Sequence, residues 1–150
     1  MTRMTTKTEL ENALKEAMRS GDEVRKRTIR MAISAIRLSE VEKGKPLDEA
    51  GLMAILQKEV KSRQEAITDA QRAQRPELAA ASQAEIVVLE GFLPKPYTQE
   101  ELVALVRQAI SEAGASSPAD LGKVMKLVTP RLQGRASGSQ ASQVVRQLLS

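Results

Sequence analysis

The sequence predicts an all-α protein, and three observations support that prediction. Apolar residues recur with helical period along the chain, and no stretch of four or more residues alternates convincingly as a strand would. The apolar residues are mainly Leu, Ile, Val, Met and Ala, with one Phe, one Tyr and no Trp in 150 residues. Because all-β cores usually contain more aromatic and β-branched residues, this composition favours closely approaching helices.

The first two expected helices have clear start and stop signals. Thr6 and Glu9 match a capping box, in which each side chain bonds the other residue's backbone N–H. Gly21 is suited to a left-handed C-cap that ends this helix. Asp22 then caps a second helix that continues to about Lys43.

Two further helices complete the N-terminal part. A third helix is expected over residues 48–74, with a mostly polar middle at 58–65. Pro76 fits the first turn of a fourth helix that continues toward Phe92. We expect the second and third helices to form a long antiparallel hairpin that dominates a four-helix domain.

A proline pair marks the expected domain boundary. Pro94 and Pro96 cannot continue a helix, and each favours extended geometry in the residue before it. The prediction is an N-terminal helical domain of residues 1–94 and a small three-helix domain of residues 95–150.

The three tail helices are also delimited by caps. Thr98-x-x-Glu101 is a second capping box, and its helix stops at Gly114. Ser117-Pro118 predicts an N-cap followed by Pro at the first position of a sixth helix. That helix is expected to end at Gly134, and a short last helix follows residues 137–139.

The residues that are missing restrict the chemistry. The chain has no cysteine and no histidine, which removes thiolate chemistry, the commonest general base and the commonest transition-metal ligand. Adjacent carboxylates such as Glu100 and Glu101 point about 100° apart on a helix and do not converge. We therefore expect a protein that is not an enzyme, with no catalytic residues, no cofactor and no metal.

The distribution of apolar residues leads to an expectation about location. The longest strictly apolar run is residues 86–89, far short of the ~20 residues that a membrane helix needs. The first six residues also lack the apolar segment of a secretory signal. We expect a cytoplasmic protein that does not associate with membranes.

Two zones of the chain are basic. Six basic and two acidic residues lie between Arg19 and Arg37, and five basic residues with no acidic one lie between Leu121 and Ser150. Such zones either bind an anionic partner or are ordinary solvated helix faces.

The second basic zone contains the candidate binding residues. Lys123 and Lys126 are three residues apart and share a helix face. The segment from Gly134 to Gly138 predicts a flexible turn that leads into a helix N-terminus, where free N–H groups favour phosphate. The alternative is an ordinary glycine C-cap beside exposed cations. The candidate RNA-binding residues are Lys123, Lys126, Arg131, Gly134, Arg135, Gly138 and Arg146.

Several segments together resemble the GatB/YqeY-like family. They are residues 120–138, the approach at 113–118, Phe92-Leu93-Pro94, Arg25-x-x-x-x-Arg30-Met31-x-x-x-Ala35-Ile36, and Lys58-Glu59-x-x-x-Arg63. The tail is similar to the C-terminal domain of the B subunit of the tRNA-dependent amidotransferase, a carbon–nitrogen ligase with glutamine as amido donor. The resemblance implies that this tail contacts tRNA, and that free-standing members lack the catalytic core.

The sequence departs from the family pattern at one position. Many members have Gly-Lys-Ala-Asp-Gly where residues 134–138 read Gly-Arg-Ala-Ser-Gly. Arg135 preserves the positive charge. Ser137 keeps an N-cap acceptor but removes an anion, so any bond specific to that carboxylate is in doubt.

The expected function is therefore non-catalytic binding of tRNA or another structured RNA. Phosphate contacts of this kind position a ligand without reading its sequence. The scarcity of aromatic residues argues against recognition of single strands, which depends on base stacking. The alternatives are a protein-interaction adaptor, or an accessory to an amidotransferase or another translation-related protein.

Overall fold

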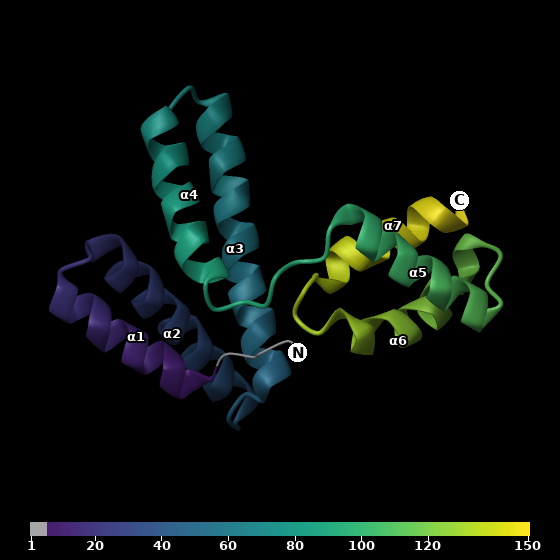
Figure 1. Ribbon diagram of the computed structural model, residues 1–150, viewed down its shortest axis with the longest axis horizontal. Helices are drawn as coiled ribbons and strands as arrows, with labels where there is room; N and C mark the ends of the chain where they lie inside the picture. The colour runs from purple at the N-terminus through teal and green to yellow at the C-terminus, as the bar shows by residue number, and fades with distance from the viewer. Residues whose placement is uncertain (1–5) are drawn as a thin grey trace. The chain divides into compact units, whose positions relative to one another are not determined.

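The computed structural model describes residues 6–150, and within that range every regular element is helical. The prediction of an all-α fold is confirmed. The chain divides after Pro94 into two compact units, which we call unit 1 (residues 6–94) and unit 2 (Lys95–Ser150). Unit 1 contains α1 (Lys7–Ser20), α2 (Glu23–Lys43), α3 (Glu49–Arg72) and α4 (Pro76–Glu90). Unit 2 contains α5 (Gln99–Ala113), the 3₁₀ helix η1 (Pro118–Asp120), α6 (Leu121–Leu132) and α7 (Gly138–Leu149) (Figure 1).

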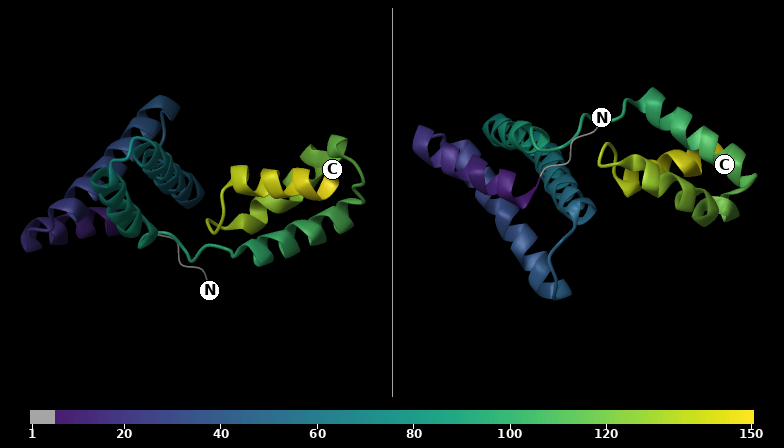
Figure 2. Two further views of the ribbon diagram at one scale, coloured as in Figure 1. Left: turned by 90° about the horizontal axis from the view of Figure 1, so that it is seen from above. Right: turned by 60° about the horizontal axis from the view of Figure 1, so that its bottom comes forward.

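Unit 1 is built from two helical hairpins. The views in Figures 1 and 2 show α1 beside α2, and α3 beside α4. The second and third helices are the longest, with 21 and 24 residues. The expected dominant pairing of those two helices is nevertheless wrong, because α3 packs most extensively on α4. The reason is the short α3–α4 connection, in which Gln74 adopts a left-handed φ of 56° and reverses the chain at once.

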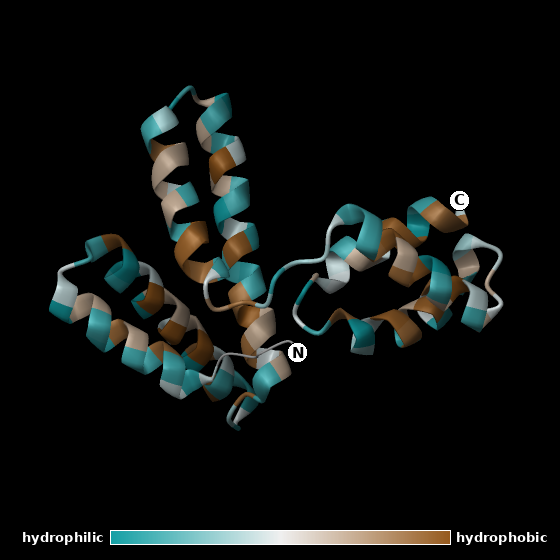
Figure 3. Ribbon diagram, in the orientation of Figure 1, coloured by the Kyte–Doolittle hydropathy of each residue, from teal (hydrophilic) through white to brown (hydrophobic). Residues whose placement is uncertain are grey.

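One hydrophobic cluster joins the hairpins of unit 1. It consists of Leu10, Ile29, Ala32, Ile33, Ile36, Leu52, Met53, Leu56 and Leu89. Figure 3 shows hydrophobic residues on the facing sides of α1 and α2. The expected caps are present: Thr6 Oγ1 accepts from the N–H of Glu9, and Asp22 Oδ1 accepts from that of Arg25. Gly21 has the left-handed φ of 72° that a side chain would disfavour.

The polar middle of α3 contains a buried charge. Arg63 is 6% exposed, and its guanidinium donates to Glu59 Oε2 at 2.7 Å and to Glu85 Oε2 at 2.9 Å. Its Nη2 lies 3.7 Å from the sulfur of Met31 on α2. Met31 belongs to α2, Glu59 to α3 and Glu85 to α4, so Arg63 links these three helices. The polar pattern of residues 58–65 does not distinguish this buried arginine from its solvated neighbours.

Unit 2 has its own hydrophobic core between α5, α6 and α7. The core is formed by Leu102, Val106, Ala109, Val124, Val128, Leu132, Ala136, Ala141, Val144, Val145 and Leu149. The capping box of Thr98 and Glu101 is complete. Ser117 is the N-cap of η1, which begins at Pro118, and α6 itself begins only at Leu121. The helix ends at Leu132, because Gln133 already adopts a left-handed φ of 50°, one residue before Gly134.

Candidate nucleic-acid interface

The candidate interface lies on α6 and α7, which run antiparallel on either side of the turn at residues 133–137 (Figure 1). Val124 and Val128 are fully buried and fix the inner face of α6. Lys123 and Lys126 consequently lie on its outer face, and both are exposed. Neither α6 nor α7 contains an acidic residue. Because the helices are antiparallel, the beginning of α6 and the end of α7, with the exposed Arg146, lie at the same end of the unit.

Asp120, the residue just before α6, has a carboxylate that is already hydrogen-bonded within the chain. Asp120 Oδ2 accepts hydrogen bonds from the backbone N–H groups of Ser116 at 3.0 Å and Ser117 at 3.3 Å. These two bonds lower the pKa of Asp120, and the charge of Lys123 lowers it further. Asp120 thus closes the turn before α6 and offsets part of the charge of Lys123.

Arg131 has a structural partner. Its guanidinium forms a bidentate ion pair with Glu112 on α5, with N–O distances of 2.7 and 2.8 Å. The hydrogen bonds between the two side chains, and to a smaller extent their opposite charges, lower the pKa of Glu112 and raise that of Arg131. The Arg131 carbonyl also accepts from the hydroxyl of Tyr97 at 2.9 Å. The structure therefore places this predicted RNA contact in the link between α5 and α6.

Arg135 also contacts its own unit. The guanidinium carbon lies 4.1 Å from the centroid of the Tyr97 ring, and Nε donates to the carbonyl of Lys95 at 2.8 Å. The backbone N–H of Tyr97 donates to the Arg135 carbonyl at 2.9 Å, and Glu101 lies 3.8 Å from the guanidinium. These contacts fasten the turn before α7 to the segment before α5.

The two predicted glycines occupy different positions. Gly134 has a left-handed φ of 75°, whereas Gly138 is the first residue of α7. Ser137 is the N-cap of α7, as predicted: its Oγ accepts from the N–H of Gln140, and the Gln140 side chain accepts from the N–H of Ser137. The first-turn N–H groups of Gly138 and Ser139 have no acceptor within the helix and can meet an anion. A Cβ on Gly138 would meet nothing within 4 Å, so this site is open.

Sequence reasoning missed Tyr97 and Glu112, the two residues that engage the arginines. Tyr97 could have been singled out from the sequence, because it is the only aromatic residue of the tail. Glu112 could not, because it is one exposed glutamate among several on α5 and its partner is 19 residues away.

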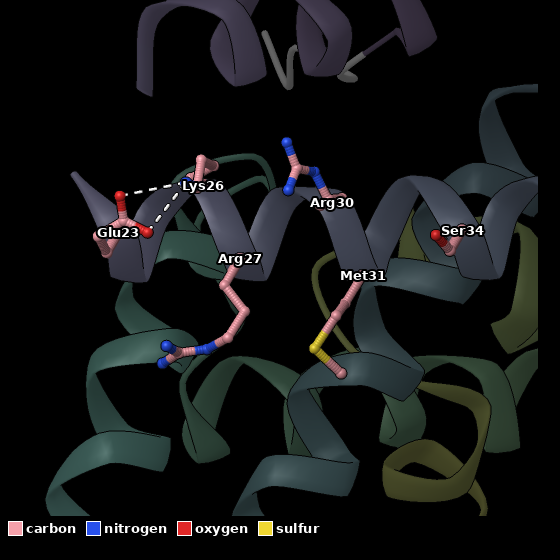
Figure 4. A pocket seen from close by; sticks show the side chains of 6 residues that line it. All are labelled: Glu23, Lys26, Arg27, Arg30, Met31 and Ser34. Carbon is pink, nitrogen blue, oxygen red and sulfur yellow. Dashed lines mark hydrogen bonds and ion pairs between the residues drawn. The ribbon is translucent and has the colours of Figure 1, made fainter. Parts of the chain in front are cut away.

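The first basic zone is less cationic in the folded chain than in the sequence. Figure 4 shows the shallow depression on α2 lined by Glu23, Lys26, Arg27, Arg30, Met31 and Ser34. Lys26 pairs with Glu23 at 3.0 Å, and Arg27 pairs with Glu85 at 3.4 Å. Arg25 lies over the ring of Phe92, 5.4 Å from its centroid. The only contact recorded for the Arg30 side chain among the described residues is with the sulfur of Met18, at 4.0 Å.

Two features are absent from residues 6–150. No three acidic residues gather closely enough to hold a metal ion. No described helix combines the length and the apolar character that crossing a membrane requires.

Comparison with known proteins identifies relatives over nearly the whole chain. The family model described as Yqey-like protein matches residues 7–149. A protein of Pyrenophora tritici-repentis named Altered inheritance of mitochondria protein 41, mitochondrial, is 33% identical over 136 residues, which cover 87% of this chain and 73% of that protein. Proteins of the same name from Lachancea thermotolerans and Kluyveromyces lactis are 32% and 34% identical, and each match covers 73% of this chain. The matched region is only 60% of the length of each of these two yeast relatives.

The names of these relatives contradict the expected cytoplasmic location. All three are named as mitochondrial proteins, so that prediction is wrong. It relied on the lack of an apolar segment. Mitochondrial targeting segments are amphipathic and rich in arginine, so the lack of an apolar segment gives no evidence against that compartment.

Proposed function

The chain belongs to the Yqey-like protein family, and we propose that it binds structured RNA, with tRNA as the favoured ligand, through unit 2. One observation carries the proposal. Lys123, Lys126 and Arg146 are exposed on two antiparallel helices that contain no acidic residue. Phosphate groups are the ligands that such a surface favours, because each contact releases condensed counterions from the nucleic acid.

The five predicted cations have two different roles in this proposal. Lys123, Lys126 and Arg146 contact phosphates directly. Arg131 and Arg135 shape the surface, since their guanidinium groups are engaged by Glu112 and Tyr97. Gly138 allows the backbone of the α7 N-terminus to approach a phosphate, and Gly134 supplies the left-handed residue that turns the chain toward it.

The aromatic residues favour folded RNA over single strands as the ligand. Phe92 and Tyr97 are the only aromatic side chains in the sequence. Arg25 covers one face of the first ring, and Arg135 covers one face of the second. Both residues are also partly buried, so neither offers the open ring on which unpaired bases stack. Recognition of RNA shape through its phosphates is consistent with this arrangement.

We further propose that the protein is not itself an enzyme. The sequence has no His and no Cys, and several of its carboxylates are used in caps and ion pairs, such as Asp120 with the backbone of two serines and Glu112 with Arg131. An RNA-binding role needs none of the missing groups.

The experiment that tests RNA binding is an equilibrium titration of labelled tRNA with the full chain at several salt concentrations. If three cations engage phosphates, counterion release predicts a log–log salt slope of roughly −2 to −3. The double variant Lys123→Glu and Lys126→Glu should weaken binding to all tRNAs alike and flatten that slope by about two units.

The matched control is the pair Lys58→Glu and Lys61→Glu. These lysines are also exposed and three residues apart on one helix, α3, so the change in net charge and in spacing is the same. Circular dichroism should show that both variants keep their helices. A tRNA affinity that does not change with salt concentration would refute RNA binding by unit 2. An equal loss of affinity in the two variants would refute it as well.

A further inference from the structure

The outward face of α2 has the spacing of a coiled-coil seam. Arg27, Met31, Ser34, Leu38 and Val41 follow one another at alternating intervals of four and three residues. We call these five residues the α2 seam. The residues that α2 buries in unit 1 lie on its opposite side. Arg27 and Met31, at the N-terminal end of the seam, contact Glu85 on α4 and Arg63 on α3. Leu38 and Val41, at its other end, are therefore the apolar seam residues that unit 1 leaves uncovered.

The apolar members of the α2 seam are exposed. Met31 is 49% exposed, Leu38 61% and Val41 78%, which makes Val41 the most exposed large apolar residue in residues 6–150. The Met31 side chain is held in place at its sulfur, which contacts the guanidinium of the buried Arg63. From Met31 to Val41 the seam extends about 15 Å along the helix, which is nearly three turns.

Cations flank the α2 seam on one side. Arg30 and Arg37 are seven residues apart and occupy the same heptad position beside it. Neither forms an ion pair with another described residue. The nearby Glu40 is bonded by Lys7 at 2.9 Å and by the N–H of Leu47, and these two bonds, with smaller contributions from the charges of Lys7 and Arg37, lower its pKa. Figure 4 shows Arg30 on the side of α2 away from Arg27 and Met31, which point toward the α3–α4 hairpin.

The charge of the whole outward face is positive. Two of its four basic residues are paired, Lys26 with Glu23 and Arg27 with Glu85. The other two, Arg30 and Arg37, stand against one acidic residue, Glu42, which leaves a surplus of one positive charge. In helix pairs, charges beside the seam select the partner by attracting the opposite sign.

We propose that the α2 seam docks an amphipathic helix of a partner protein, with an apolar stripe flanked by glutamate or aspartate. The leucine and valine of the seam would insert between apolar side chains of that helix, and its carboxylates would pair with Arg30 and Arg37. A nucleic acid would use the arginines and leave Leu38 and Val41 exposed. An anionic membrane favours Trp, Phe or Leu on the apolar face, whereas this face has a single leucine and no aromatic residue.

The test uses the full chain and a fluorescent synthetic helix of four heptads, with Leu at positions a and d and Glu at positions e and g. The glutamates repel one another across a peptide dimer and keep the probe monomeric. Fluorescence anisotropy should show binding that weakens as salt increases. A second peptide of the same charge, with Gln in place of Leu, should not bind.

Two pairs of substitutions locate the site. Leu38→Gln with Val41→Gln should weaken peptide binding about tenfold or more, because the buried apolar contacts are lost. Leu78→Gln with Val87→Gln is the matched control on α4, where the side chains are 48% and 63% exposed, and it should leave binding unchanged. Arg30→Glu with Arg37→Glu should reverse the preference in favour of a peptide with Lys at positions e and g.

Several outcomes would overturn the proposal. One is failure of the Leu–Glu peptide to bind the wild-type chain, and another is equal loss of binding in the α2 and α4 variants. A third is loss of binding to phosphatidylglycerol vesicles or to tRNA in the Leu38–Val41 variant while peptide binding is unchanged. This surface belongs to unit 1, so its test can fail while RNA binding by unit 2 stands.

Discussion

Arg135 stacks on Tyr97, with 4.1 Å between the guanidinium carbon and the ring centroid, while the backbone N–H of Tyr97 donates to the Arg135 carbonyl. The two residues are 38 positions apart, and together they hold the turn before α7 against the segment before α5. An arginine that looks like a phosphate ligand in the sequence is thus a structural contact in the fold.

The first prediction concerns the stability of unit 2. Arg135→Ala should lower its unfolding free energy by about 1–2 kcal/mol, because the ring contact and the bond to Lys95 are both lost. Arg135→Lys should recover only part of the lost stability. Lysine lacks the planar guanidinium, which stacks on the Tyr97 ring while it donates to the Lys95 carbonyl. Tyr97 is the sole tyrosine and no tryptophan is present, so its fluorescence during urea unfolding reports on unit 2 directly. An Arg135→Ala variant as stable as the wild type would contradict this role.

The second prediction concerns the buried charge of unit 1. Arg63→Ala removes the partner of Glu59 and Glu85, whose side chains are only 20% and 16% exposed. We expect a loss of about 3 kcal/mol, at the lower end of the range for a broken buried pair, because both carboxylates retain some contact with water.

Two further variants check this explanation of the Arg63 effect. Replacing Arg63 by Met together with Glu59→Gln and Glu85→Gln should restore much of the stability, since no unpaired charge is left buried. Arg27→Ala removes an exposed partner of Glu85 and should cost less than about 1 kcal/mol. Urea unfolding followed by circular dichroism measures all three variants. If Arg27→Ala costs as much as Arg63→Ala, burial is not the reason for the effect.

The third prediction concerns pH. The backbone N–H groups of Ser116 and Ser117 lower the pKa of Asp120 from its ordinary value of 3.8. A lowered folded-state pKa means that the carboxylate stabilises the fold above about pH 4, and that this contribution is lost as the pH falls through the folded-state pKa. Asp120→Ala should therefore lower the thermal midpoint of unit 2 at pH 7.

The difference between wild type and Asp120→Ala should shrink as the pH is lowered from about 5 to 2, because protonation weakens the same acceptor in the wild type. Thermal scans of Tyr97 fluorescence across this range make the measurement. Asp69→Ala removes an exposed carboxylate of unit 1, and it should not change the thermal midpoint of unit 2. A difference that is constant with pH would show that the charge of Asp120 is not what stabilises the turn.

The fourth prediction concerns the boundary between the units. The carbonyl of Lys95 and the N–H of Tyr97 are both bonded to Arg135, so the chain after Lys95 is held to unit 2. The earliest cuts by proteinase K should fall at residues 91–95, the segment between α4 and these bonds. Trypsin should spare Lys95, because proline follows it. First cuts within residues 50–90 would show that the α3–α4 hairpin opens before the boundary does.

Much of the secondary structure could be predicted because its determinants are local. Thr98 and Glu101 are three residues apart, and Gly114 ends their helix by its own left-handed φ of 64°. The same holds for Asp22, Gly21 and the cap of α7 at Ser137. A clear local error is the start of α6, because a 3₁₀ helix from Pro118 to Asp120 comes before it. The Asp120 carboxylate accepts a hydrogen bond from the backbone N–H of Ser116, and this bond holds the tighter 3₁₀ geometry.

The helical class, the caps and the basic surplus of α6 and α7 follow from the amino-acid sequence alone, since they depend on composition and on residues a few positions apart. Which of the cations are exposed depends instead on how the helices pack. Lys123 and Lys126 remain in solvent, whereas Arg131 is bound by Glu112, Arg135 by Tyr97 and Arg63 by Glu59 and Glu85. The physical reason is that several of these partners lie 19 to 40 residues away along the chain, so only the packing of helices brings the charges together.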